Sequence, residues 1–287
     1  RAACLAETIG FDHRVPGVDR IQIVRIVGLI QPHVEIFGQH RPAGNVLPFG
    51  GVVIVVERLI VRRADWGDVQ PNDDFGCDMN DLSDPAIDVY DNAMFIIALD
   101  YLLEMAPDSP QASRWKSLRE GIERNVRAHL WDVKRQKFIP HIYPEKSPIP
   151  EGFDELAIHY HGGTAIAIEA GLLSKDEIRT VNAQMLENVR LSGMPSIGLT
   201  LYPVYPDGFF HGGMSKAYLY QNGGDWTWFG GRMIQQLVVN GMVEEAYAEI
   251  HPMIERVIQN DGFYEWYGKG GVPSGSGNFK GSAGVLS

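Results

Sequence analysis

From about residue 84 onward, apolar residues recur at helical spacing in long segments that come in pairs. In residues 109–130 every third or fourth position of one face is apolar, from Trp115 to Leu130. A helical hairpin cannot bury its apolar face alone, so successive hairpins must stack side by side. We therefore expect an all-α fold of stacked helical hairpins. Stacking in a ring gathers the connecting loops at one end, where a site can form.

The predicted helices form about three pairs and the beginning of another helix. Asp84 followed by Pro85 is typical of a helix start, because Asp caps free N–H groups and Pro suits the first turn. Ser174 and Glu177 have the spacing of a capping box. Residues 131–140 predict a turn and a short strand instead. The predicted helices cover residues 84–104, 109–130, 155–171, 174–189, 233–240, 243–259 and 279–287.

Residues 1–61 differ from everything that follows. Residues 21–30 and 51–61 are rich in β-branched side chains, which favour strands. One interpretation is a small β-rich region ahead of a helical domain at residues 62–287. The other is a segment not native to the fold, such as a shifted reading frame upstream of a genuine domain. We place no function in residues 1–61 under either interpretation.

Composition excludes several classes of partner. The chain has 287 residues and a net charge of −11, which argues against nucleic acid or an anionic membrane surface as the main partner. No apolar run approaches the ~20 residues of a membrane span. Cys4 and Cys77 provide neither a disulfide framework nor a metal site. No secretory signal is recognised, which slightly favours a cytoplasmic location. The chain starts at Arg1, so we expect a fragment or a processed product.

The segment of residues 220–232 combines flat aromatic faces with polar groups and glycines. Stacking faces beside hydrogen-bonding groups suit a sugar, which has apolar C–H faces and a rim of hydroxyls. The alternative is a buried aromatic loop that only packs the start of a helix. The residues concerned are Gln221, Asn222, Gly223, Gly224, Asp225, Trp226 and Trp228.

Two loops place carboxylates beside aromatic rings, residues 63–68 and residues 262–268. An aromatic wall partly removes water from a carboxyl group, which favours its protonated form. Hydrolysis of a glycosidic bond needs one protonated and one ionised carboxyl group on opposite sides of the bond. Most loop carboxylates, however, are helix caps or solvated surface groups, and that interpretation stays open at this point.

The sequence resembles the six-hairpin inverting glycosidases, the group that includes processing α-glucosidase I, mannosylglycerate hydrolase and trehalase. Residues 262–284 resemble their C-terminal pattern of an aromatic-Tyr-Glu segment, a glycine-rich stretch and Phe-x-x-Ser-Ala. The Tyr-x-Asn-Gly-Gly-x-Trp-x-Trp segment at residues 220–228 resembles the loop that these enzymes use against the substrate. Residues 65–68, Asp-Trp-Gly-Asp, match the acid loop more loosely. The resemblance covers about residues 62–287 and implies an all-α fold, an (α/α) toroid of helical hairpins that is incomplete at its N-terminal side.

The resemblance implies an inverting mechanism with Asp68 as general acid and Glu265 as general base, and no metal or cofactor. Asp65 matches a position before the acid of the family and is the weaker candidate. Inversion requires the two carboxyl groups to lie ~6.5–9.5 Å apart, with a water between them. The substrate is expected to be an α-glucoside or a related sugar. The expected substrate-binding residues are Trp66, Asp65, Tyr90, Asp91, Asn92, Gln221, Asn222, Gly223, Gly224, Asp225, Trp226, Trp228, Arg232, Trp266 and Tyr267.

The chain departs from the family pattern because a complete ring needs twelve helices. Two other functions therefore stay open: a sugar phosphorylase on the same fold, or a carbohydrate-binding fragment without activity. Exposed helix faces also leave a homo-oligomer open. His159 and His161 would not share one face of a helix, so they predict no metal pair. Arg232 and the tryptophans have structural alternatives, an ion pair and core packing.

Overall fold

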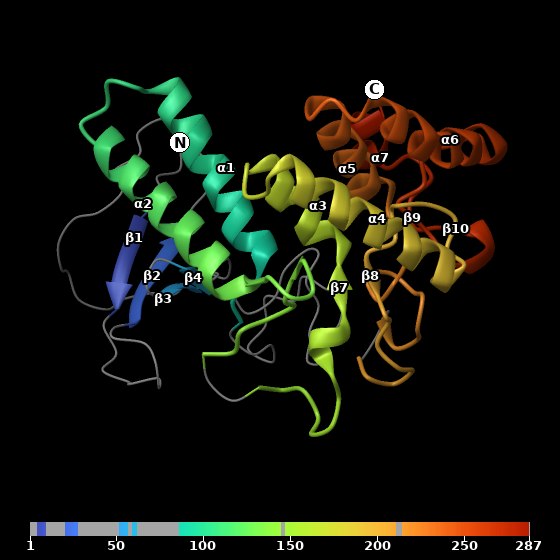
Figure 1. Ribbon diagram of the computed structural model, residues 1–287, viewed down its shortest axis with the longest axis horizontal. Coiled ribbons are helices and arrows are strands. Elements are labelled where there is room, and N and C mark those ends of the chain that lie inside the picture. Colours follow the sequence, from blue (N-terminus) through green and yellow to red (C-terminus); the bar gives the residue numbers. More distant parts are fainter. Residues whose placement is uncertain are drawn as a thin grey trace.

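The computed structural model describes residues 86–144, 147–210 and 214–286, and the backbone of four strands within the first 61 residues. These strands form one antiparallel sheet in the order β1-β2-β3-β4, and β4 packs against α1 and α2 (Figure 1). The strands predicted within residues 21–30 and 51–61 are confirmed, whereas β1 was not predicted. The strands are β1 (Leu5–Ile9), β2 (Ile21–Val27), β3 (Val52–Val56) and β4 (Leu59–Val61).

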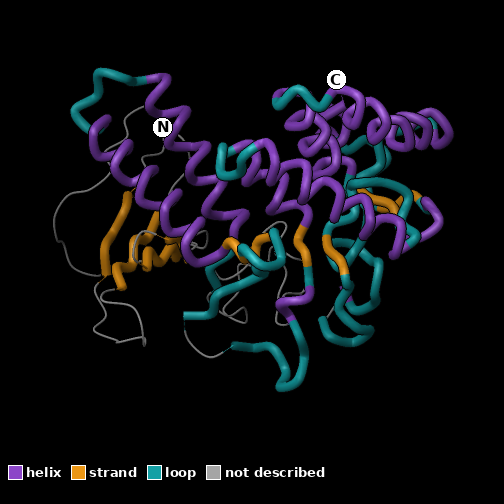
Figure 2. The backbone as a smooth tube through the Cα atoms, in the orientation of Figure 1, coloured by secondary structure: helices purple, strands orange, loops and turns teal. Residues whose placement is uncertain are grey.

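Helices dominate the rest of the described chain, as Figure 2 shows. Helices α1, α3, α5 and α7 pack against one another in succession, while α2 packs on α1, α4 on α3 and α6 on α5. The helices therefore form two rows, with one helix of each consecutive pair in each row. The helices are α1 (Val89–Met105), α2 (Ala112–Asn125), α3 (His161–Glu169), α4 (Lys175–Ser192), α5 (Thr227–Val239), α6 (Val243–Asn260) and α7 (Lys280–Leu286).

The second row is joined by polar contacts between consecutive helices. A π-helical turn at Val126–Leu130 extends α2. Arg127 in this turn lies 2.6 Å from the carboxylate of Glu177 on α4. Asn182 on α4 donates a 2.7 Å hydrogen bond to Glu249 on α6, and both side chains are buried. These contacts fix the spacing of α2, α4 and α6.

Most predicted helix ends agree with the structure. The capping box at Ser174 is present, with Ser174 accepting from the backbone of Glu177 and Glu177 accepting from the backbone of Ser174. The prediction that α1 starts after Asp84 is wrong, because Asp88 is the cap and Val89 the first helical residue. Two backbone hydrogen bonds of 2.8 and 2.9 Å between Ile87 and Ile142 hold the chain extended just before α1.

The predicted helix over residues 155–171 is also wrong in its first half. The chain forms a 3₁₀ turn at Glu155–Ala157, then strand β7 (His159–Tyr160), and only then α3. The reason is tertiary, because β7 pairs with β8 (Leu201–Tyr202), a strand that lies far along the chain. Gly171 follows the end of α3 with a φ of 73°, as its role as a stop predicts.

Short hairpins connect the helices. The predicted excursion at residues 131–140 is confirmed as β5 (Trp131–Asp132) paired with β6 (Lys137–Phe138). The glycine-rich C-terminal loop contains a further hairpin of β9 (Trp266–Tyr267) and β10 (Pro273–Ser274). Among the helices of the described residues, none has the length and apolar character needed to cross a membrane.

Candidate functional site

The structure brings together the two C-terminal segments that the sequence singled out. The backbone N–H of Asp225 donates to the carbonyl of Tyr267 at 2.9 Å, and that of Tyr267 donates to the carbonyl of Asp225 at 2.8 Å. Gly224 is needed for the tight turn of its own loop, because a Cβ there would lie 2.2 Å from the Tyr220 carbonyl oxygen. The same Cβ would lie 3.2 Å from Cε3 of Trp266 in the other segment. The residue 220–232 loop and the residue 262–268 loop therefore form one surface.

Glu265, the predicted general base, is held between the β9–β10 hairpin and α7. Its backbone N–H donates to the carbonyl of Ser276 at 2.9 Å, and its Oε2 accepts from the N–H of Ser276 at 3.2 Å. Ser282 on α7 donates to the carbonyl of the preceding Tyr264 at 2.9 Å. A Cβ on Gly275 would lie 2.4 Å from Oε2, so only glycine fits beside this carboxylate. The backbone of Glu265 is therefore held by Ser276, which also orients one oxygen of the half-buried side chain.

Three aromatic rings form a cluster that includes Trp266, the residue after Glu265. Tyr220 contacts Trp226 with ring centroids 5.0 Å apart, and Trp266 with ring centroids 6.1 Å apart. Trp226 is completely buried and donates from Nε1 to the carbonyl of Tyr220 at 3.2 Å. Its ring therefore packs in the core and stabilises the loop. Trp266 and Tyr220 stay partly accessible. The stacking face available to a ligand is therefore made by Trp266 and Tyr220, and Tyr220 was not among the predicted binding residues.

Trp228 lies in the first turn of α5, whereas the sequence placed it in the loop before the helix. The guanidinium of Arg232, one turn later, lies 4.9 Å from the centre of the Trp228 ring. Arg232 also pairs with Glu169 at the end of α3, with an Nε–Oε2 distance of 3.0 Å. Arg232 therefore forms the ion pair that the sequence left open as its structural alternative.

Asn222 and Asp225 are fully buried and are bonded to other parts of the protein. Asn222 accepts from the N–H of Tyr205 at 2.9 Å and donates to the carbonyl of the same residue at 3.1 Å. Asp225 accepts from Ser196 at 2.6 Å and lies 2.7 Å from Nη1 of Arg256. In this arrangement both side chains hold loops in place, and their predicted contact with sugar hydroxyls stays a prediction.

Gln221 differs from these neighbours. Its side chain is only 1% exposed, and within the described part of the chain neither atom of its carboxamide has a hydrogen-bond partner. Its backbone carbonyl accepts from Thr200 at 2.8 Å. Gly223, the residue two positions later, has a φ of 83° and is also buried. A ligand hydroxyl or a water could satisfy the Gln221 carboxamide.

The remaining predicted site residues fall into two groups. Tyr90, Asp91 and Asn92 are buried in the first turn of α1, where the Asp91 N–H donates to Asp88 at 2.7 Å. The Tyr90 ring meets Phe229 of α5 edge-on, with centroids 6.3 Å apart. The predicted acid-loop residues lie outside the described residues, and they are Asp65, Trp66 and Asp68.

His159 and His161 lie on β7 and at the start of α3, with ring centroids 5.0 Å apart. Burial is the main cause that lowers the pKa of His161 to about 3, and it lowers the pKa of His159 well below its ordinary value. His159 contacts Thr164 at 3.1 Å and His161 contacts Asn188 at 2.9 Å. Both rings are therefore neutral core histidines. The described residues contain no group of three His, Cys, Asp or Glu side chains placed to hold a metal ion.

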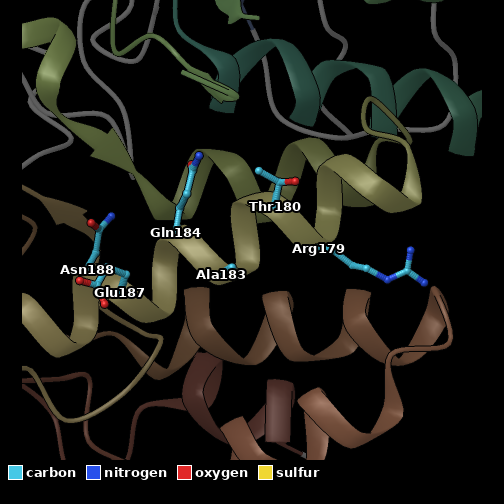
Figure 3. A pocket seen from close by; sticks show the side chains of 6 residues that line it. All are labelled: Arg179, Thr180, Ala183, Gln184, Glu187 and Asn188. Atoms are coloured by element: carbon cyan, nitrogen blue, oxygen red, sulfur yellow. The ribbon is translucent and has the colours of Figure 1, made fainter. Parts of the chain in front are cut away.

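A shallow hollow lies elsewhere, along α4. Figure 3 shows that all its labelled side chains come from that one helix. None of these residues is aromatic, and none belongs to the residue 220–232 or 262–268 segments. We therefore place the candidate site at Glu265 instead. The residues lining this hollow of about 590 Å³ are Arg179, Thr180, Ala183, Gln184, Glu187 and Asn188.

No protein-family model matches the chain, and no curated protein matches its sequence. Its fold is similar to that of the GH63 mannosylglycerate hydrolase from Thermus thermophilus. The structure with Tris and D-glycerate gives a TM-score of 0.53 at 18% identity, over 70% of this chain and 45% of that chain. An uncharacterized conserved protein from the same organism gives 0.54 at 16% identity, over 70% and 46% of the two chains.

These similarities show that the chain shares a mainly helical fold with glycoside hydrolases. The chain spans less than half of the length of these similar structures. The resemblance found in the sequence is thereby supported at the level of the fold.

Proposed function

We propose that the chain is part of the catalytic domain of an inverting glycoside hydrolase that cleaves an α-glucoside or a related sugar. One observation carries the proposal: Glu265, whose Oε2 accepts from Ser276, directly precedes Trp266, and the partly accessible rings of Trp266 and Tyr220 contact each other. The helical fold shared with glycoside hydrolases supports the same conclusion. The flat apolar face of Trp266 would take a sugar ring by stacking.

The chemistry requires two carboxyl groups. Asp68 would protonate the oxygen of the leaving group, and Glu265 would remove a proton from the water that attacks the opposite face of the sugar. The hydrogen bond from Ser276 to Oε2 keeps the Glu265 carboxylate oriented. Asp68 has this role by resemblance, because its position in the sequence matches the end of the acid loop.

The test is hydrolysis of aryl α-glycosides and α-linked disaccharides by the chain and by the variants Asp68→Asn and Glu265→Gln. Loss of a general acid or base typically lowers the rate about 10²–10⁴-fold, and we expect that loss in both variants. Glu255→Gln is the matched control, because Glu255 is exposed on α6, where it faces His251. Proton NMR of the first sugar released should show the β-anomer from an α-linked substrate.

A second candidate is a carbohydrate-binding fragment without activity. This role would need only the surface that the residue 220–232 and 262–268 segments form together, without the acid loop. A folded chain that binds sugar but hydrolyses no member of the panel would establish this candidate. Turnover that requires inorganic phosphate would instead indicate a sugar phosphorylase.

A further inference from the structure

Three loops meet at the carboxylate of Glu155, a residue that the sequence did not single out. Its Oε1 is contacted by Nδ1 of His141 at 2.7 Å and accepts from the hydroxyls of Tyr143 at 2.8 Å and Tyr205 at 3.2 Å. The Tyr205 hydroxyl also bonds the hydroxyl of Tyr160 at 2.9 Å. Contacts from two separate segments, residues 141–143 and Tyr205, thus fix one oxygen of this carboxylate.

The second oxygen of Glu155 is available. In the described part of the chain no hydrogen bond reaches Oε2, and the side chain is 11% exposed, whereas that of His141 is only 1% exposed. A carboxylate oxygen that keeps its acceptor sites and is already oriented loses little entropy when it accepts from a ligand. The arrangement is therefore suited to accept hydrogen bonds from the hydroxyls of a polyol.

Glu155 is connected to the candidate site through Tyr205 and the residue 220–232 segment. Its donor Tyr205 is held by both ends of the Asn222 carboxamide, in the residue 220–232 loop. Tyr220, in the same loop, packs against the apolar cluster that contains Tyr205 and also contacts the ring of Trp266. One continuous set of contacts therefore runs from Glu155 to the residue beside Glu265.

We propose that Glu155 is a substrate-binding carboxylate of this site, and that its Oε2 accepts from hydroxyl groups of the bound sugar. The inference rests on the proposed function for the class of ligand. Glu155 has a positioning role here, because the cleavage itself is assigned to Asp68 and Glu265. The loss of one such charge-assisted hydrogen bond should weaken binding about tenfold.

The experiment measures the binding of methyl α-glucoside by ligand-observed NMR, with the Glu265→Gln substitution present throughout so that turnover plays no part. Addition of Glu155→Gln should raise the dissociation constant about tenfold. Glu151→Gln, an exposed residue of the same loop, removes the same charge and should leave the dissociation constant nearly unchanged. Circular dichroism checks that each variant is folded.

A second measurement covers the case in which Glu155→Gln does not fold. Monodeoxy analogues of methyl α-glucoside are titrated into the chain without the Glu155 substitution, and one of them should bind about tenfold more weakly. Unchanged affinity in a folded Glu155→Gln variant, equal affinity for all analogues, or no binding at all would overturn the proposal. Sugar binding that depends on Glu155 in a chain without hydrolysis would contradict the proposed function while supporting this inference.

Discussion

Among single residues, a buried ion pair is central to the candidate site. Asp225 is completely buried, and Arg256 lies 2.7 Å from it while its guanidinium stacks 4.0 Å above the ring of Tyr267. Arg256 also donates to Thr227 at 2.7 Å, at the start of α5. This pair therefore joins α6, the residue 220–232 loop and the segment that carries Glu265.

Removal of one partner of this pair should be costly, because the other charge is left buried without compensation. We expect Arg256→Met to lower the free energy of unfolding by about 3–5 kcal/mol, measured by urea denaturation. The double variant Asp225→Asn with Arg256→Met should recover part of that loss. A double variant as unstable as the sum of the two single variants would contradict an interaction between the two side chains.

Among the packed elements, the contact between α4 and α6 contains a buried carboxyl group. Glu249 accepts from Asn182, and its other oxygen, Oε2, has no partner among the described residues. Burial is the main cause that raises the pKa of Glu249 from 4.5 to about 7. The folded chain consequently keeps a proton on Glu249 between these two values, where the unfolded chain releases it.

This proton makes the stability depend on pH. The contribution of Glu249 is most favourable below about pH 4.5 and is lost progressively as the pH rises towards 7. The total loss is on the order of 3 kcal/mol, at about 1.36 kcal/mol per unit of pKa shift. Glu249→Gln should remove this dependence and unfold at a higher urea concentration than the unchanged chain at about pH 8. Parallel pH profiles for both proteins would refute this prediction.

In the molecule as a whole, one apolar core runs through the helices. A continuous cluster of buried and partly buried side chains extends from Ile87, before α1, to Leu286 at the end of α7. The β-rich region contacts the helices at least through β4, which packs on α1 and α2. The predicted division at residue 61 coincides with the end of β4 and stays a prediction.

A chain that begins at residue 62 tests this division. We expect it to keep its helical circular dichroism signal and a cooperative thermal transition, because the core from Ile87 to Leu286 remains. The midpoint should fall by several degrees, since the contacts of β4 are lost. Loss of the helical signal would instead mean that residues 1–61 belong to the same folding unit as the helices.

The candidate site shows how far inference from the sequence could reach. Trp266, Glu265 and the glycines could be recognised because they form a contiguous pattern in the chain. Glu155 could not, because its donors His141, Tyr143 and Tyr205 come from segments that only the fold brings together. Asn222 looked like a ligand-binding amide, yet its partner is the backbone of Tyr205, 17 residues earlier.

Local sequence was sufficient to predict most of the helices, because their apolar spacing, caps and terminal glycines act within a few residues of one another. The capping box at Ser174 and the apolar face of α2 are examples. Distant partners determined the rest: the strand at His159–Tyr160, the start of α1 beside Ile142, and the pairing of Asp225 with Arg256. The physical reason is that backbone pairing and buried ion pairs are stabilised by groups far away in the chain. A short stretch of sequence does not contain those groups, so it cannot predict these contacts.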